Sequence, residues 1–439
     1  MAFLTSSDKA LWHLALPMIF SNITVPLLGL VDTAVIGHLD SPVYLGGVAV
    51  GATATSFLFM LLLFLRMSTT GLTAQAYGAK NPQALARALV QPLLLALGAG
   101  ALIALLRTPI IDLALHIVGG SEAVLEQARR FLEIRWLSAP ASLANLVLLG
   151  WLLGVQYARA PVILLIVGNI LNIVLDIWLV MGLHMNVQGA ALATAIAEYG
   201  TFFIGLWMVW HVLTMRGISV SLLKTAWRGN IRTLLALNRD IMLRSLLLQL
   251  CFGALTVFGA RLGPDIVAVN AVLMTLLTFT AYALDGFAYA VEAHSGQAYG
   301  ARESGQLRDV WRAACRQAGL VALAFALTYA CFGQQIIALL TSLPRLRELA
   351  GHYLIWQAIL PVVGVWCYLL DGMFIGATRG AEMRNSMAVA AAGFALTLLT
   401  VPPLGNHGLW LALTVFLALR GASLAVIWRR HWQRGTWFS

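Results

Sequence analysis

Apolar runs of roughly 20 residues recur along the whole chain, with short polar breaks between them. A helix rises about 1.5 Å per residue, so a run of this length spans the hydrocarbon core of a bilayer. The chain is 60% hydrophobic and only 10% charged, whereas soluble domains carry about 25% charged residues. Because a lipid-exposed backbone must satisfy its own hydrogen bonds, this pattern predicts an all-α integral membrane protein without a water-soluble domain.

The sequence also repeats itself at an offset of 222 residues. The segment 75–80, Gln-Ala-Tyr-Gly-Ala-Lys, returns as Gln-Ala-Tyr-Gly-Ala-Arg at 297–302. The same offset relates four further pairs: Gly37 and Gly259, Pro42 and Pro264, Gly150 and Gly372, and Gly154 and Gly376. Matches this far apart at one offset predict two homologous halves, a design that is common in transporters.

Twelve transmembrane helices follow from the apolar runs, six in each half. We place them near 11–37, 44–74, 88–107, 130–156, 161–182, 187–213, 241–262, 266–296, 311–340, 350–377, 385–403 and 407–428. The predicted organisation is an amino-terminal six-helix lobe at 1–213, a cytoplasmic linker at 214–240 and a carboxy-terminal six-helix lobe at 241–439. Six is even, so both lobes should have the same orientation in the bilayer.

Lys and Arg gather in the breaks on one predicted side of the membrane, for example in 80–87, in 302–316 and in the tail after 428. The opposite breaks near 38–40, 184–186 and 405–407 carry neither residue. The positive-inside rule therefore predicts a multi-pass protein with both termini in the cytoplasm. This distribution explains the net charge of +10 without a nucleic-acid partner, and we expect a monomer surrounded by lipid.

The first span contains an acid that lipid tolerates poorly, Asp32. An ionised Asp inside a transmembrane helix costs about 2.5–3.5 kcal/mol, so a chain that keeps one usually uses it. Pro26 cannot donate a hydrogen bond to the carbonyl of Asn22, which predicts a helix hinge before the acid. The alternative is an Asp near the outer interface that water reaches and that has no role.

The fifth span carries a second polar feature. Asn169, Asn172 and Asp176 are spaced i, i+3 and i+7, so they form one stripe along a helix. A polar stripe in a membrane helix should face the interior of the bundle.

These polar residues are expected at similar depths. Asp32 and Asp176 should both lie roughly 8–9 Å below the outer boundary, and Thr194 of the sixth span about 10 Å below it. Glu198 follows one turn deeper on the same face, and Asn145 of the fourth span is a further member. The first, fifth and sixth spans are therefore predicted to form one site.

Two carboxylates in one low-dielectric layer should share a proton that a cation can displace. This is the chemistry of ion coupling, because neutralising the pair changes which conformation is favoured. The alternative is an interhelical hydrogen-bond cluster that only holds the spans together, at about 0.6 kcal/mol per bond.

The second half does not repeat these acids, since the offset maps Asp32 onto Ala254 and Asp176 onto Leu398. Coupling is therefore expected in the first half. Glu292, beside the repeated segment, could pair with a nearby Arg or have a function. Candidates for a substrate cavity are polar or aromatic residues within spans: Asn145, Asn169, Glu198, Tyr282, Asp285 and Asp371.

With these residues in view, the chain resembles the multidrug and toxic compound extrusion (MATE) transporters. The resemblance rests on Leu-Val-Asp-Thr-Ala-Val-Ile-Gly at 30–37, the repeated segment at 75–80 and Asn-Ile-Val-Leu-Asp at 172–176, and it covers essentially the whole chain. It implies two six-helix lobes and a central cavity that opens alternately to each side of the bacterial inner membrane. The implied activity is export of small organic compounds, often cations, against inward flow of H⁺ or Na⁺.

The resemblance also assigns roles to residues. Asp32 would be the principal protonation site, with Asn172, Asp176 and Thr194 completing the cation pocket, and Pro26 would form the bend of the first helix. A Na⁺ ion at these four polar residues is the implied alternative to a proton; no other metal and no cofactor is expected. Many relatives have an acidic ligand in the seventh span, but 246–261 contains no acid here, which favours H⁺ coupling through the first lobe.

Two other functions remain as alternatives. A lipid-linked precursor flippase of the same superfamily would need a basic cavity, and Lys and Arg are scarce within the spans. An intramembrane enzyme would need a motif such as GxSxG or HExxH inside a span, and the sequence has neither. It also lacks the phosphate-binding GxxxxGK[ST] motif, so the expected driving force is an ion gradient.

Overall fold

The computed structural model describes residues 6–37, 39, 41–229 and 231–438, with the side chains of all of these except Ser7 and residues 24–34. The described residues form helices and short connections, without a strand. The first half contains α1 Ser6–Gly37, α2 Pro42–Leu61, α3 Phe64–Gly78, α4 Pro82–Leu105, α5 Arg107–Val118, α6 Glu122–Arg135, α7 Ala139–Gly154, α8 Arg159–Asp176 and α9 Asn186–Met215. The rest contains α10 Val220–Thr225, α11 Ile231–Arg261, α12 Pro264–Ala301, α13 Ser304–Leu340, α14 Pro344–Gly351, α15 Leu354–Gly376, α16 Gly380–Thr397, α17 Val401–Leu404 and α18 Asn406–Arg434.

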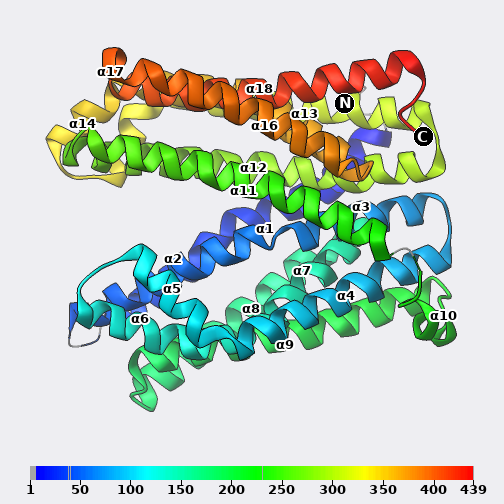
Figure 1. Cartoon of the computed structure of the whole chain (residues 1–439), viewed down its shortest axis with the longest axis horizontal. Helices are drawn as coiled ribbons and strands as arrows, with labels where there is room; N and C mark the ends of the chain where they lie inside the picture. Colours follow the sequence, from blue (N-terminus) through cyan, green and yellow to red (C-terminus); the bar gives the residue numbers. More distant parts are fainter. Residues whose placement is uncertain (1–5, 38, 40, 230, 439) are drawn as a thin grey trace. The chain divides into compact units, whose positions relative to one another are not determined.

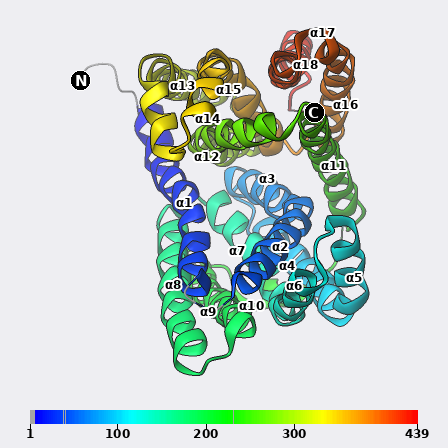
Figure 2. The ribbon, with the colours of Figure 1, turned by 90° about the vertical axis from the view of Figure 1, so that its left-hand side faces the viewer.

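Two compact units divide the chain, one of Thr24–Leu234 and one of Met1–Ile23 with Leu235–Ser439. Within each unit the long helices run side by side (Figure 1), and they are seen nearly end-on in Figure 2. The start of α1 packs with the second unit: Trp12 lies 5.8 Å from Phe287 of α12 between ring centroids, and Asp8 pairs with Arg316 of α13 at 2.9 Å. The lobe borders that the sequence suggests at 213 and 240 stay predictions.

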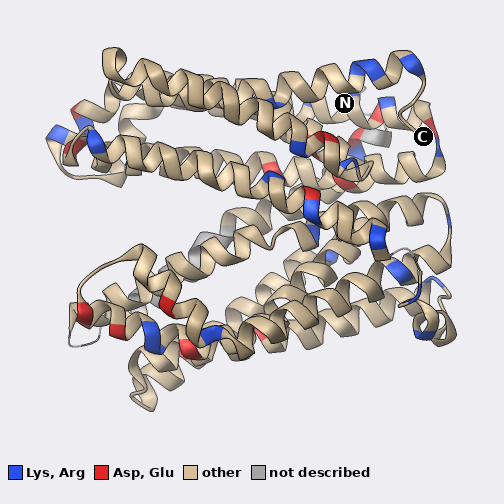
Figure 3. Ribbon diagram, in the orientation of Figure 1, with Lys and Arg blue, Asp and Glu red and all other residues tan. Residues whose placement is uncertain are grey.

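Eleven candidate membrane spans lie in the described part of the chain, each a helical stretch long and apolar enough to cross a bilayer. Charged residues are sparse along the helices, which have long uncharged stretches (Figure 3). The repeat is visible in the helix starts, since α2 and α12 begin at Pro42 and Pro264, and α4 and α13 begin at Pro82 and Ser304. The predicted all-α membrane fold built from two related halves is confirmed.

The repeated glycines mark the closest helix crossings. A Cβ atom on Gly150 of α7 would lie 2.7 Å from the main-chain oxygen of Arg66 on α3, and one on Gly372 of α15 would lie 2.7 Å from that of Ala288 on α12. Gly154 and Gly376, one turn later, are equally crowded. Each pair is a GxxxG motif, which lets two membrane helices approach until their backbones touch. The repeat therefore preserves a packing contact at the centre of each unit.

One predicted span is interrupted. The run 44–74 forms two helices, α2 and α3, joined by a turn at Leu62 and Leu63. The turn contains neither Gly nor Pro, so no local signal marks it. After the turn, α3 packs tightly on α7. Thr69 and Thr70 of α3 are fully buried and lie beside Gly150 of α7.

Helices extend beyond several apolar runs. The predicted span 130–156 is preceded by α6, which begins at Glu122 after the capping side chain of Ser121, and a short 3-10 turn at Trp136–Ser138 joins α6 to α7. The predicted linker at 214–240 contains α10 and the first ten residues of α11. Hydropathy marks only the part of a helix that contacts lipid, whereas the helix continues until a cap or turn ends its hydrogen bonds.

Candidate functional site

The polar stripe on α8 faces the interior of the unit formed by residues 24–234. Asn172 and Asp176 are buried, with 4% and 0% of their surface exposed, and Asn169 is half-buried one turn earlier. On α9 the hydroxyl of Thr194 donates to Oδ1 of Asn172 at 3.4 Å and to the carbonyl of Ala190 at 3.1 Å. The structure therefore brings together Asn172 of the fifth span and Thr194 of the sixth.

Asp176 occupies the last position of α8, where the chain passes into a π-helix at Ile177–Gly182. Short π-helical segments are rare and often lie at functional sites, because the wider turn shifts the side chains that follow it. After Arg159, neither α8 with its π-helix nor α9 contains a Lys or Arg. The helices that surround this buried carboxyl thus contribute amide and hydroxyl groups rather than cations.

Two predicted residues, Asp32 and Pro26, belong to the stretch 24–34, whose side chains lie outside the described residues. Farther along α1, Val35 and Ile36 are buried in the same cluster as Val180 of the π-helix and Ala190 of α9. The expected convergence of Asp32 with Asp176 and the hinge at Pro26 stay predictions.

Glu198 belongs to a separate polar cluster that joins three helices. The Asn145 side chain of α7 donates to Oε2 of Glu198 at 3.0 Å and to its main-chain oxygen at 3.1 Å. Arg135 of α6 places Nη2 3.7 Å from Oε1 of Glu198 and donates through Nη1 to Ser138 at 2.6 Å. The predicted neighbours Asn145 and Glu198 do meet, and Arg135, which was not among the predicted site residues, supplies the charge opposite Glu198.

Asp371, on α15 of the other unit, is held between two arginines. Its Oδ2 atom accepts a hydrogen bond from Arg244 of α11 at 2.7 Å and one from Arg420 of α18 at 2.6 Å. The three side chains are only 6–10% exposed. Neither arginine was predicted to belong to a site, although each is a cation within an apolar run, and that pattern indicates a buried ion pair.

The other candidates of this unit lie on α12. Asp285 is half-buried and close enough to Cys367 and Tyr368 of α15 for its charge to act on both. Tyr282 is half-buried, and its main-chain oxygen accepts a hydrogen bond from Asn22 at 3.2 Å. Glu292 is 1% exposed. Whether Asp285 and Tyr282 line a substrate cavity, and whether Glu292 pairs with an Arg, stay predictions.

Metal-binding residues do not gather in the described part of the chain, where no group of three or more His, Cys, Asp and Glu side chains could hold an ion. The oxygen atoms around Asp176 are of the carboxylate, amide and hydroxyl type, which suits protons and hard monovalent cations.

Comparison with known proteins identifies the family. The MatE family model matches residues 17–178 and 241–404. The chain is 88% identical to DNA damage-inducible protein F of Escherichia coli strain K12, over 100% of this chain and 96% of that protein. It is 23% identical to a probable multidrug resistance protein NorM of Acinetobacter baylyi, over 94% of this chain and 93% of the relative.

A solved structure shares the fold. A MOP superfamily transporter from Pyrococcus furiosus superposes with a TM-score of 0.83 at 21% identity, over 98% of this chain and 96% of that one. The two matched segments of the family model fall in the two halves of the repeat. The resemblance that the sequence motifs predict is confirmed, and the chain belongs to the MatE family of multi-pass membrane transporters.

Proposed function

We propose that this protein is a secondary active antiporter that exports organic compounds, often cations, in exchange for H⁺. The observation that carries the proposal is Asp176, a fully buried carboxyl at the start of a π-helix. A buried acid in a membrane helix is a functional site by default, because its ionised form is expensive to keep there. Family membership supports the same reading, since the curated relatives include proteins named for multidrug resistance and export.

Coupling would proceed by competition for one negative charge. With its partner Asp32, Asp176 takes up a proton from outside, and the neutral pair favours the conformation in which the first lobe closes and releases substrate. Loss of the proton to the cytoplasm restores the charge and the affinity for a cationic substrate. An exchange of one proton for one monovalent cation moves no net charge, so the difference in proton concentration across the membrane drives export.

Na⁺ is the alternative coupling ion at the same place. Asp32, Asn172, Asp176 and Thr194 would supply its oxygen ligands, and hard oxygen donors are what such an ion requires. The absence of an acid in 246–261 favours H⁺, because it leaves the second lobe without the ligand that many relatives have. We place the protein in the bacterial inner membrane as a monomer, with both termini in the cytoplasm.

The test is dye transport in proteoliposomes that carry either a pH gradient or a Na⁺ gradient. We expect the wild type to move a cationic dye under the pH gradient, and Asp176→Asn and Asp32→Asn to abolish transport. Asp309→Asn, the same substitution at an exposed position of α13, is the matched control and should transport normally. Transport by Asp176→Asn at the wild-type rate would exclude this carboxyl as the coupling site. Wild-type transport that needs the Na⁺ gradient and does not occur under the pH gradient would show that Na⁺, not H⁺, is the coupling ion.

The flippase alternative gains one observation, the buried arginines Arg244 and Arg420. A pyrophosphate-linked lipid needs cations in the cavity, but both arginines already bind Asp371. Assays in the same proteoliposomes distinguish the two functions, because a flippase would translocate a fluorescent lipid pyrophosphate and an exporter of cations would not.

A further inference from the structure

A groove of about 940 Å³ lies within the second unit, between α13 and α18, with α15 as its floor. Its volume falls at the upper end of the range for pockets that hold small molecules, about 300–1,000 Å³. The groove is open along one side, where Val362 and Trp366 are 42% and 43% exposed on α15, a helix long and apolar enough to cross a bilayer. A ligand that enters sideways from the bilayer can therefore reach it.

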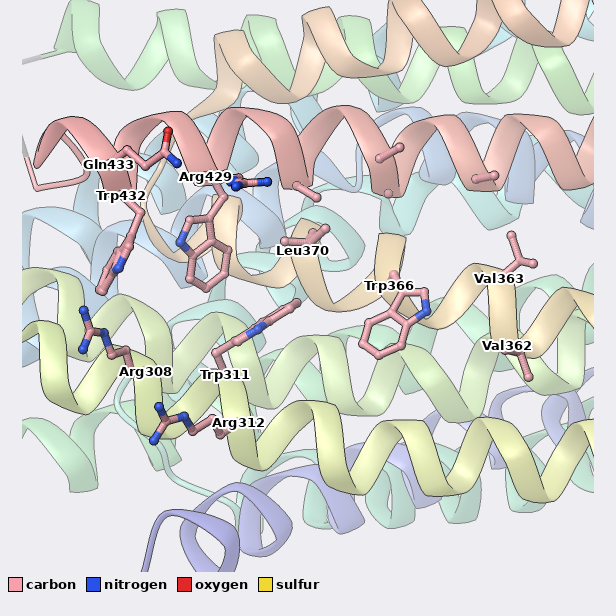
Figure 4. Close-up of a pocket in the computed structure, with 15 residues that line it drawn as sticks. Arg308, Trp311, Arg312, Val362, Val363, Trp366, Leu370, Arg429, Trp432 and Gln433 are labelled. Atoms are coloured by element: carbon pink, nitrogen blue, oxygen red, sulfur yellow. The ribbon is translucent and has the colours of Figure 1, made fainter.

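The two ends of the groove differ in chemistry (Figure 4). Arginines and tryptophans gather at one end: Arg308, Trp311, Arg312, Arg429 and Trp432. Val362 and Val363 line the other end with small residues of α18. The guanidinium of Arg308 lies 4.7 Å above the ring of Trp432, and the rings of Trp311 and Trp428 meet edge to face at 4.9 Å. Tryptophans beside cations are typical of the level of lipid headgroups.

The three arginines of the cationic end outnumber the acids near them in sequence, since Asp309 alone stands between Arg308 and Arg312. Among the described residues no Asp or Glu forms an ion pair with Arg308, Arg312 or Arg429, whereas Arg316, further along α13, pairs with Asp8 at 2.9 Å. Three guanidinium groups favour an anion, and Arg in particular binds phosphate through paired hydrogen bonds. The side of the membrane predicted to be cytoplasmic, where this end lies, also presents anionic lipids to basic residues.

The corresponding groove of the first unit is filled by the chain itself. There the segment around α10 lies against α4 and α9, and Ile218 and Ala226 are buried in one cluster with Leu89 and Val212. Gln91 of α4 fixes this segment by donating to the carbonyl of Gly229 at 2.6 Å. The repeat places Ala313 of α13 where Gln91 stands, and Ala cannot donate a hydrogen bond. The second groove thus lacks the side chain that anchors the covering segment in the first.

We propose that the groove binds one anionic phospholipid. Its phosphate lies among Arg308, Arg312 and Arg429, and its acyl chains run past Trp366 toward Val362, along the small residues Ala418 and Ala422 of α18. The lipid covers in the second unit the surface that the linker covers in the first.

The test is native mass spectrometry of the full-length protein in detergent, titrated with palmitoyl-oleoyl phosphatidylglycerol or with phosphatidylcholine of the same chains. The wild type should bind the first phosphatidylglycerol at least about 10-fold more tightly than phosphatidylcholine. The triple variant Arg308→Gln, Arg312→Gln, Arg429→Gln should lose this preference. The control Arg232→Gln, Arg430→Gln, Arg434→Gln removes the same charge from exposed positions outside the groove and should keep it.

A second variant tests the acyl end without changing charge. Ala422→Phe narrows the groove and should weaken phosphatidylglycerol binding about 10-fold, whereas Val389→Phe on the exposed face of α16 should leave it unchanged. Equal loss in both triple variants, or equal affinity of the wild type for the two lipids, would overturn the proposal. Displacement of the lipid by millimolar inorganic phosphate, together with normal binding by Ala422→Phe, would assign the site to a soluble anion and also overturn it.

Discussion

Asp176 and Asp371 are both buried carboxyls in membrane helices, but their surroundings differ. Asp371 accepts hydrogen bonds from Arg244 and Arg420 at 2.7 and 2.6 Å. Asp176 lies between α8 and α9, whose membrane portions contain no Lys or Arg, beside the hydrogen-bonded pair Asn172 and Thr194. Two guanidinium groups bind Asp371 directly, whereas the helix that carries Asp176 and the neighbouring α9 have no Lys or Arg in their membrane portions.

The difference separates two uses of a buried acid. A carboxylate that is bound by two guanidinium groups joins α11, α15 and α18 into one body. A carboxyl among amide and hydroxyl groups can exist in either protonation state, which ion coupling requires. We therefore infer that the first lobe holds the exchangeable charge and the second holds a structural one.

The largest effect is expected from Asp371→Asn. The substitution leaves Arg244 and Arg420 buried without a counter-charge, and removing one partner from such a group typically costs about 3–5 kcal/mol. Thermal unfolding in detergent should show a large drop in the melting temperature. The triple variant Arg244→Met, Asp371→Leu, Arg420→Met removes all three charges together and should recover most of the stability. A melting temperature of Asp371→Asn within a degree of the wild type would contradict a structural role.

The repeated glycines should make equal contributions to the stability of the two units. Gly150→Val and Gly372→Val each place side-chain atoms against a main-chain oxygen that would lie 2.7 Å from the new Cβ. Overpacking of this kind costs about 1–3 kcal/mol, and we expect similar losses from both in the same unfolding assay. Gly98→Val, at a position with open space around it, is the control. A loss in only one variant would show that the crossings are not equivalent.

The smallest effect on stability is expected from Thr194→Val. It removes the 3.4 Å hydrogen bond to Asn172, and bonds of this type contribute about 0.6 kcal/mol in a membrane. Dye transport should nevertheless fall more than stability does, because the hydroxyl belongs to the proposed cation pocket. Thr201→Val, on the same helix with only a hydrogen bond to its own backbone, should leave transport unchanged. Equal effects of the two substitutions would remove Thr194 from the pocket.

Much of the fold can be predicted from the sequence, because each step depends on local or periodic information. Apolar length predicts the helices, and the offset of 222 residues predicts the repeat whose glycines form the helix crossings. The stripe of Asn172 and Asp176 is likewise a matter of helical spacing, and both residues are buried as expected.

The remaining features depend on contacts between distant segments. Arg244 and Arg420 are 176 residues apart, and only the packing of α11, α15 and α18 brings them to Asp371. The turn between α2 and α3 contains no Gly or Pro, so the local sequence does not predict it. The contacts of residues 8–22 with α12 and α13 cannot be predicted from the periodicity of apolar residues. Arg135 was not predicted as a site residue because it lies near the beginning of an apolar run, and cations are common at the ends of membrane spans.

The most direct measurement is proton release when a cationic dye is added to the purified protein, compared between Asp176→Asn and the charge-free triple variant at Arg244, Asp371 and Arg420. Our account predicts that Asp176→Asn releases no protons although it folds, and that the triple variant releases as many as the wild type. Release that persists in Asp176→Asn and disappears in the triple variant would contradict the account, because it would place the exchangeable charge in the second lobe.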